Sequence, residues 1–192
     1  MTPTFKDSAQ ELGKVLEASL AMAPAVEKAG EAIVQAILAG GKLLTCGNGG
    51  SAADALHLAE ELVGRYSVER RALPALCLNA DATAITCICN DYGYEHVFSR
   101  GVEALGKPGD VIVGFTTSGN SANVIAAFEV AAKRGVTTIL LAGKDGGAAR
   151  GTCDHEIIVP SSNTARIQEV HTLVLHQWLE AIDATPWPET LP

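Results

Sequence analysis

Residues 42–63, KLLTCGNGGSAADALHLAEELV, join a short apolar run to a glycine-rich turn and then to a segment with helical spacing. The apolar run at the start is typical of a buried strand, and the apolar side chains after Ser51 recur at helical intervals. Three glycines and a serine stand at the junction, where glycine lets the backbone approach a ligand closely. The stretch predicts a strand, a ligand-binding turn and a helix.

The same alternation continues along the chain. Strands are predicted near residues 42–46, 74–79, 110–116, 137–142 and 156–159, and helices near 51–64, 94–105, 121–134 and 163–183. Residues 5–39 carry apolar side chains at helical intervals and end at Gly40 and Gly41, which predicts one or two helices with a break near Pro24.

Short apolar strands separated by helices are typical of a parallel sheet that is covered on both faces. We therefore expect an α/β fold, a doubly wound five-stranded parallel sheet flanked by helices, in the flavodoxin-like order 2-1-3-4-5. The expected organisation is one domain over residues 1–192, with N-terminal helices in 1–40, an α/β core in 41–183 and a loosely attached tail in 184–192.

Composition narrows the class of protein. Hydrophobic residues make up 47% of the 192 positions, enough for a substantial core. The sequence opens on no secretory pattern and its apolar runs are too short to span a bilayer, so we expect a cytoplasmic protein without membrane association. The formal charge of −8, with scattered basic residues, argues against a nucleic-acid partner.

The five cysteines are expected to be reduced core residues. Cys46, Cys77, Cys87 and Cys89 lie in apolar segments that resemble strands. Their spacing lacks the Cys-x-x-Cys pattern of structural zinc or redox sites.

The first glycine loop, residues 47–52, fits the G-x-G-x-x-A pattern of dinucleotide-binding folds. That pattern also requires an acidic residue about 20 positions later. Asp81 lies 34 residues after Gly47, so the match is weak. A tight turn whose glycines only relieve steric strain is the alternative.

A second loop, Thr116-Thr-Ser-Gly-Asn-Ser121, follows the strand predicted at 110–116 and leads into a helix. Its hydroxyl groups, its free backbone N–H groups and the positive end of the helix favour a site for a phosphate monoester. The alternative is that Ser118 or Ser121 only caps the helix. Strands 1 and 3 are neighbours in the expected sheet, so the two loops should face one crevice.

Polar side chains on two predicted helices are candidates for chemistry. His57 shares a helix face with Glu60 at i+3 or Glu61 at i+4, and spacing alone does not choose between them. Gln168 and His176 are eight residues apart, roughly 80° around a helix.

Each of these groups also has a plain structural reading. His57 and Glu61 can form a solvated pair on a helix surface. Either His171 or His176 can be a core histidine whose hydrogen bonds are satisfied.

Several segments together resemble the SIS (sugar isomerase) domain family and, within it, the phosphoheptose isomerases. The similarity extends over nearly the whole chain and is carried by CGNGGSAADALHLAEELVGRY (46–66), NDYGYEHVFSR (90–100), GDVIVGFTTSGNSANV (109–124), GKDGG (143–147) and ARIQEVHTLVLH (165–176). The chain departs from the family pattern at residues 163–165, which lack an acidic residue, and at Thr116, where serine is frequent.

The resemblance implies isomerisation of sedoheptulose 7-phosphate to D-glycero-D-manno-heptose 7-phosphate through an enediol, for lipopolysaccharide heptose. It implies that Glu61 is the base and His176 the acid, and that Zn²⁺ is bound by His57, Glu61, Gln168 and His176. Arg65 would reach the site of a neighbouring subunit in a homotetramer. The positions that match substrate contacts are Asn48, Gly49, Ser51, Arg65, Asn90, Asp91, Thr116, Thr117, Ser118, Ser121 and Gln168.

Two other functions were weighed against the isomerase. A non-catalytic SIS-domain regulatory protein, binding a sugar phosphate or a replication initiator, would lack the glutamate pair that this chain carries as Glu60 and Glu61. An NAD-dependent oxidoreductase is supported by residues 47–52 alone and gives no role to the hydroxyl groups of residues 116–121. Both comparisons favour the isomerase.

Overall fold

The computed structural model describes residues 2–192 and contains one five-stranded, wholly parallel sheet. The strands are β1 (Leu43–Gly47), β2 (Ala75–Cys77), β3 (Val111–Thr116), β4 (Thr137–Gly143) and β5 (His155–Val159). Their order is β2-β1-β3-β4-β5, which confirms the predicted topology. In the register, Gly47 lies beside Phe115, so the loops after β1 and β3 leave the sheet at the same edge.

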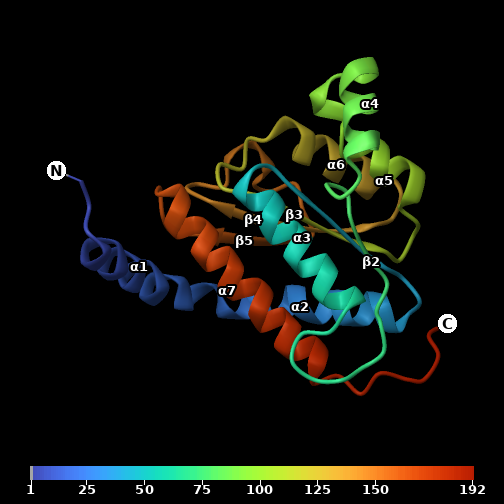
Figure 1. Ribbon diagram of the computed structural model, residues 1–192, viewed down its shortest axis with the longest axis horizontal. Coiled ribbons are helices and arrows are strands. Elements are labelled where there is room, and N and C mark those ends of the chain that lie inside the picture. Colours follow the sequence, from blue (N-terminus) through green and yellow to red (C-terminus); the bar gives the residue numbers. More distant parts are fainter. Residues whose placement is uncertain (1) are drawn as a thin grey trace.

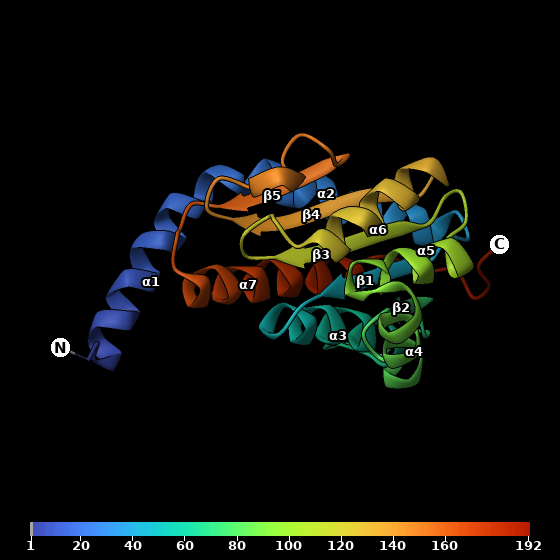
Figure 2. The ribbon, with the colours of Figure 1, turned by 90° about the horizontal axis from the view of Figure 1, so that it is seen from above.

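Helices cover both faces of this sheet, as Figures 1 and 2 show. One apolar core lies between the sheet and α2 (Ala23–Leu38), α3 (Gly50–Val63) and α7 (Thr164–Asp183). The other lies between the opposite face and α5 (Ser99–Leu105) and α6 (Ala122–Lys133). Because both faces are buried, every residue of β1 and β3 is buried, which explains why these strands are apolar apart from Thr45 and Thr116.

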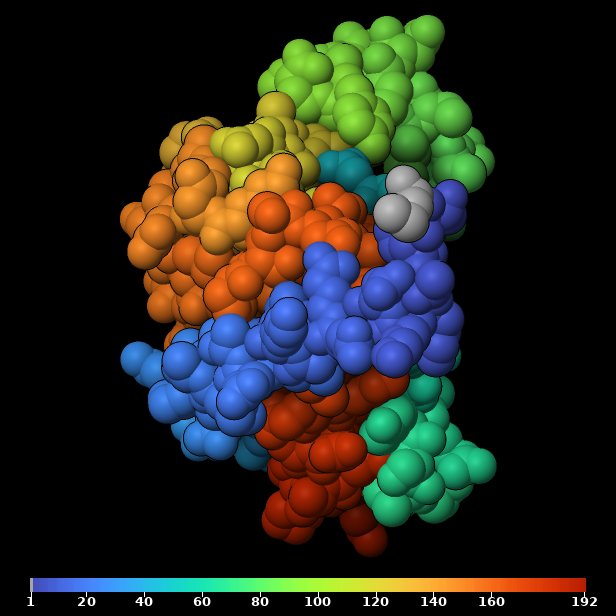
Figure 3. Space-filling model, turned by 90° about the vertical axis from the view of Figure 1, so that its left-hand side faces the viewer, coloured from blue at the N-terminus to red at the C-terminus, as the bar shows by residue number. Residues whose placement is uncertain are grey.

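The N-terminal helices are two, as the sequence allowed. Helix α1 (Phe5–Ser19) begins with a capping box between Thr4 and Asp7, and a short 3-10 segment, η1 (Leu20–Met22), separates it from α2. Pro24 stands in the first turn of α2, where its missing N–H needs no partner. In Figure 3 these helices (blue) lie across α7 and the last strands.

Helix α4 (Ala82–Tyr92) was not predicted. The carboxylate of Asp81 caps its first turn, accepting hydrogen bonds from the N–H groups of Thr83 and Ala84. None of the described residues 82–92 is buried, and the helix stands out from the sheet in Figure 1. Its apolar side chains, among them Ile85, Ile88 and Cys89, are only partly buried against the core. In the sequence they form one short, largely apolar run, which resembles a strand as much as a helix. Another 3-10 turn, η2 (Tyr94–His96), fills the start of the helix expected at 94–105.

The cysteine prediction is correct only in part. All five thiols are free, and Cys46 and Cys77 are buried as expected. Cys87 and Cys89, however, lie on α4 and not on a strand, and Cys87 is exposed. Cys87 and Cys89 are less buried than predicted because they lie on a helix that stands away from the sheet, although their neighbours in the sequence are apolar.

The C-terminal tail is held more firmly than predicted. The guanidinium of Arg71 donates to the carbonyl oxygens of Pro188 at 2.9 Å and Glu189 at 2.7 Å. The indole N–H of Trp187 donates to the carbonyl of Ile182 at 2.8 Å. These bonds tie residues 187–189 to the end of α7 and to the loop after α3.

The same loop is anchored by a buried ion pair between Arg70 and Asp183. Nε of Arg70 lies 3.0 Å from Oδ1 of Asp183, and both side chains are 5% exposed. The second oxygen, Oδ2, accepts hydrogen bonds from the backbone N–H groups of Ser67 and Val68 at 2.8 and 3.1 Å. Burial alone would raise the pKa of Asp183, but these donors and Arg70 together hold it below its usual value.

Asp183→Asn should therefore lower the free energy of unfolding at pH 7 by about 1.5–3 kcal/mol, the usual value of hydrogen bonds to a charged group. The native pKa is depressed, so the contribution is present above the unfolded pKa of about 4 and is lost as the pH falls below it. Urea unfolding at pH 7 and at pH 3.5 checks this, and the gap between variant and wild type should narrow at the lower pH. Glu69→Gln is the control, since its side chain is 90% exposed. If the unfolding free energies of Asp183→Asn and wild type differ by the same amount at pH 7 and at pH 3.5, this role of Asp183 is contradicted.

Candidate active site

The loops after β1 and β3 meet through a pair of amide side chains. Nδ2 of Asn48 donates to Oδ1 of Asn123 at 2.9 Å, and Nδ2 of Asn123 donates back to Oδ1 of Asn48 at 2.9 Å. Asn48 follows β1, whereas Asn123 lies in the first turn of α6 and is buried. The bonds show that the two loops meet at the same edge of the sheet, as the topology predicted.

The first loop is braced from both sides. Asn79, just beyond β2, accepts from the N–H of Gly47 at 3.2 Å and donates to its carbonyl at 2.9 Å. The hydroxyl of Tyr94 donates to Oδ1 of Asn48 at 2.7 Å. Gly49, which caps α3, has a φ of 58°, a left-handed conformation that favours glycine. Ser51 lies buried in the first turn of α3.

The second loop uses its hydroxyl groups otherwise than in helix capping. Ser121 occupies the N-cap position of α6, yet its hydroxyl is 2.9 Å from that of Thr116. Ser118 accepts from the N–H of Asn120 at 3.1 Å, and Thr117 is half-buried. The hydroxyl of Ser121 does not cap α6, and in the first turn the side chain of Asn123 accepts from the N–H of Val124 at 3.0 Å. The positive end of the helix dipole faces the loop. This arrangement suits a phosphate group.

On α3 the structure chooses between the two glutamates. Nε2 of His57 lies 3.4 Å from Oε1 of Glu61, whose side chain is 18% exposed. Glu60 is exposed, although its carboxylate also comes within 4.8 Å of a ligand atom of each of the other two residues. Glu61 is thus the glutamate that is partly shielded from water beside His57.

Helix α7 brings Gln168 and His176 to the same side. Gln168 packs on Gly50 so closely that a Cβ at that glycine would lie 2.3 Å from its Nε2. The ring of His176 meets that of His57 edge-on with centroids 5.1 Å apart, and Tyr66 stacks on it at 5.7 Å. Two imidazoles, a carboxylate and an amide therefore line the seam between α3 and α7. Nitrogen and oxygen donors of this kind fit Zn²⁺, although glutamine is an unusual ligand.

The structure separates the two histidines of α7. His171 is fully buried, and its Nε2 lies 3.2 Å from the carbonyl oxygen of Ala142. Burial lowers the pKa of His171 to about 4, so the ring is neutral at physiological pH. His171 is the core histidine, and His176, half-buried, is the one that faces the seam.

Three predicted substrate contacts do not touch the two loops within one chain. Arg65 lies just past the end of α3, with 58% of its side chain exposed, and pairs with Glu69 at 3.8 Å. Asn90 and Asp91 are exposed at the end of α4 and bond to each other at 2.7 Å. Their assignment to the substrate remains a prediction from the resemblance.

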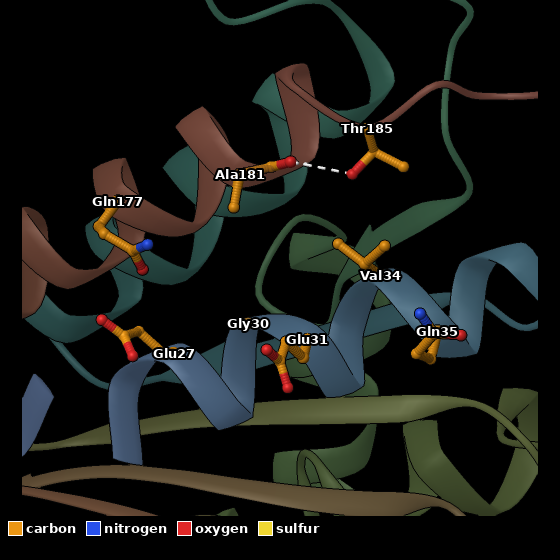
Figure 4. Close-up of a pocket in the computed structure, with 8 residues that line it drawn as sticks. All are labelled: Glu27, Gly30, Glu31, Val34, Gln35, Gln177, Ala181 and Thr185. Atoms are coloured by element: carbon orange, nitrogen blue, oxygen red, sulfur yellow. Dashed lines mark hydrogen bonds between the residues drawn. The ribbon is translucent and has the colours of Figure 1, made fainter. Parts of the chain in front are cut away.

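A hollow of about 260 Å³ lies elsewhere, between α2 and α7 (Figure 4). Glu27, Glu31, Gln35 and Gln177 are among the side chains that line it, and the set includes no lysine, arginine or histidine. Two carboxylates would repel a phosphorylated sugar. The hollow is therefore a poor competitor to the crevice as a site for such a ligand.

Comparison with known proteins identifies the family. The SIS domain matches residues 4–143. A phosphoheptose isomerase of Shewanella denitrificans is 49% identical to the chain, and the alignment covers 98% of each protein. The chain belongs to the phosphoheptose isomerase family. It is accordingly an enzyme, which decides against the non-catalytic regulator and the oxidoreductase.

Solved structures of phosphoheptose isomerases agree with the fold. The enzyme of Neisseria gonorrhoeae superposes with a TM-score of 0.86 at 43% identity, covering 93% of this chain and 96% of that one. The enzyme of Francisella tularensis gives 0.88 at 35% identity, covering 96% and 100%. The predicted SIS fold is confirmed.

Several residues around the isomerase site were not predicted. Asn123 and Tyr94 bond to Asn48, Tyr66 stacks on His176, and Asn79 braces the first loop through Gly47. Asp54 is buried on α3 and accepts a hydrogen bond from Thr172. Asn123 carried a signal, since it falls in the first turn of the helix that follows the phosphate loop. Asp54 carried one too, because it lies one turn before His57 on the same helix face.

Proposed function

We propose that this isomerase converts sedoheptulose 7-phosphate to D-glycero-D-manno-heptose 7-phosphate, for lipopolysaccharide heptose synthesis. The observation that carries the proposal is the amide pair between Asn48 and Asn123, which puts both loops on one crevice at the start of α3. The name and sequence identity of the relatives support the substrate.

The layout of α3 suits a long sugar with its phosphate at one end. The helix starts at the glycine loop, and it carries His57 about two turns and Glu61 about three turns farther along. In a 2-ketose 7-phosphate, the phosphate and the reacting carbons C1 and C2 lie at opposite ends of the carbon chain. Phosphate bound between the loops leaves C1 and C2 free to extend along α3 toward Glu61.

The proposed reaction moves two protons and changes no oxidation state overall. The carboxylate of Glu61 takes a proton from C1 of the ketose, which gives the enediol, and returns a proton to C2. His176 transfers a proton between the oxygens on C1 and C2, so that the carbonyl shifts to C1. A positioned base and acid of this type contribute roughly 10²–10⁴-fold each to the rate.

We also propose that Zn²⁺ is held by His57, Glu61, Gln168 and His176, whose donor atoms fit it. When bound, the ion would polarise the substrate oxygens as a Lewis acid. His176 belongs to both the catalytic pair and the set of zinc ligands, and so does Glu61. Its Oε1 is the atom that lies beside His57, and the carboxylate has a second oxygen for proton transfer.

A homotetramer in the cytoplasm completes the proposal. Residues such as Leu76, Ile85 and Ile88 line an apolar hollow of about 200 Å³ below α4, a surface suited to a second copy. Arg65 is exposed and free to reach a neighbouring site. Five free thiols suit a reducing compartment. Light scattering gives the mass, and a monomer would contradict the tetramer.

The direct test is to incubate the purified enzyme with sedoheptulose 7-phosphate and follow the aldose product by NMR. We expect aldose to form, and we expect prior treatment with a chelator to abolish its formation until Zn²⁺ is added back. Turnover that survives complete metal removal would contradict the metal assignment alone. Absence of aldose from the untreated enzyme would contradict the substrate.

Among residues 2–192, no helix is both long and apolar enough to cross a membrane.

A further inference from the structure

Asp54 occupies a central place in the seam between α3 and α7. The two helices run side by side in the same direction (Figure 1). Three layers of side-chain contacts connect them. Gly50 meets Gln168 in the first layer and His57 meets His176 in the third. Between them, the hydroxyl of Thr172 donates to Oδ1 of Asp54 at 2.9 Å. The carboxylate thus lies between the layers that carry the four proposed metal ligands.

The second oxygen of this carboxylate is unusual. Asp54 is only 8% exposed, and its Oδ2 is buried without a hydrogen-bond partner in residues 2–192. Burial raises the pKa of Asp54, while Thr172, His57 and His176 act to lower it. A buried, unpaired charge is costly unless opposite charge lies nearby. A hydrogen bond between the two helices would need only a neutral side chain at position 54. The negative charge of Asp54 therefore has a further role.

We propose that Asp54 is a positioning residue whose negative charge, fixed by Thr172 behind His57 and His176, strengthens the binding of a divalent cation by the four ligands. The inference extends the proposed metal site. Asp54 is not itself a ligand in this account, because it acts through the field that it places on the ligand layers. Carboxylates beside metal-binding histidines, usually bonded to the ring N–H, raise metal affinity, and their mutation typically lowers it 10- to 100-fold. Within residues 2–192 Asp54 bonds to Thr172 and to neither ring, so it acts through its charge.

The test measures Zn²⁺ affinity, with the ion as the only ligand. Wild type, Asp54→Asn and Thr172→Val are stripped of metal and titrated against a chromophoric chelator. Asparagine keeps the shape and the acceptor for Thr172 but removes the charge. We expect Asp54→Asn to weaken zinc binding roughly 10- to 100-fold. Thr172→Val keeps the carboxylate and removes only its hydrogen bond to the hydroxyl, so its loss of affinity should stay below about tenfold, under the range typical of a lost outer carboxylate.

Thermal unfolding of the metal-free proteins separates this role from a purely structural one. The melting temperature of Asp54→Asn should equal or exceed that of wild type, because a buried charge has been removed. If Asp54→Asn fails to fold, Asp54→Ser, smaller and neutral, carries the same expectation. An unchanged zinc affinity, or a loss shared equally by Thr172→Val, would overturn the role of Asp54 alone. A wild type that binds no zinc would overturn the metal site and this inference together.

Discussion

Glu61→Gln should bind sedoheptulose 7-phosphate with nearly wild-type affinity and lose turnover by about two to four orders of magnitude. Glutamine has almost the same shape as glutamate, but its amide cannot take a proton from carbon. Steady-state turnover, together with calorimetric titration of the substrate on the variant, checks both halves of the expectation. A loss of turnover without a loss of binding is the signature of a group that acts in the transition state.

Glu60→Gln is the matched control for this experiment. The two glutamates are adjacent on α3, but Glu60 is exposed, whereas Glu61 is partly shielded beside His57. We expect the Glu60 variant to retain turnover within a few-fold of wild type, as is usual for an exposed side chain. Normal turnover in Glu61→Gln, or an equal loss in both variants, would refute Glu61 as the base.

Gly119→Ala should disable the phosphate loop. Gly119 has a φ of 66°, and a Cβ at this position would lie 1.8 Å from the backbone carbonyl oxygen of Gly146. Backbone atoms cannot yield as a flexible side chain can, so the loop between β3 and α6 must move and carry Ser118 and Ser121 with it. We expect the Michaelis constant for the sugar phosphate to rise at least about tenfold, since loss of only 1.4 kcal/mol of binding has that effect.

Stability should fall as well, by about 2–4 kcal/mol, the sum of left-handed strain and overpacking. Gly151→Ala separates the two causes. Its φ is 79°, but a Cβ there meets nothing within 4 Å. It should show only the strain, with substrate binding unchanged. Thermal melts and steady-state kinetics on both variants test these expectations. A normal Michaelis constant in Gly119→Ala would show that this loop does not bind the phosphate.

The sheet was predictable from the sequence because its signals are local and repeated. Strands that are buried on both faces are mainly apolar, and the short apolar runs of β1 and β3 predict such strands directly. Parallel connections through helices then restrict the topology to a few choices. The meeting of the two loops followed from strand order alone, before any contact between Asn48 and Asn123 was known.

Helix α4 escaped prediction for a physical reason. A helix is predicted from an apolar stripe at helical spacing, whereas the apolar residues of α4 form one short run near residues 85–89 that is only partly buried in the structure. Its ends did carry signals, with Asp81 as the N-cap and Gly93 just past the last residue at a φ of 91°. Asp81 can also be interpreted as the acidic residue of a dinucleotide fingerprint, and that interpretation hides its capping role.

The details of the site could not be predicted from the sequence for a different reason, which is that they depend on contacts between distant segments. Helical spacing put His57 near both Glu60 and Glu61, and only packing against α7 distinguishes them. The bond between Asp54 and Thr172 joins residues 118 positions apart. No local pattern encodes such a pairing, because it depends on how two helices pack against each other on one face of the sheet.

The most direct measurement is a crystal structure of Glu61→Gln soaked with sedoheptulose 7-phosphate, which the variant should hold without converting. We expect the phosphate among the hydroxyl groups of residues 116–121 and the N-terminus of α6, with C1 and C2 of the sugar against the side chain at position 61. A phosphate bound elsewhere, or a residue 61 turned away from C1 and C2, would contradict the account.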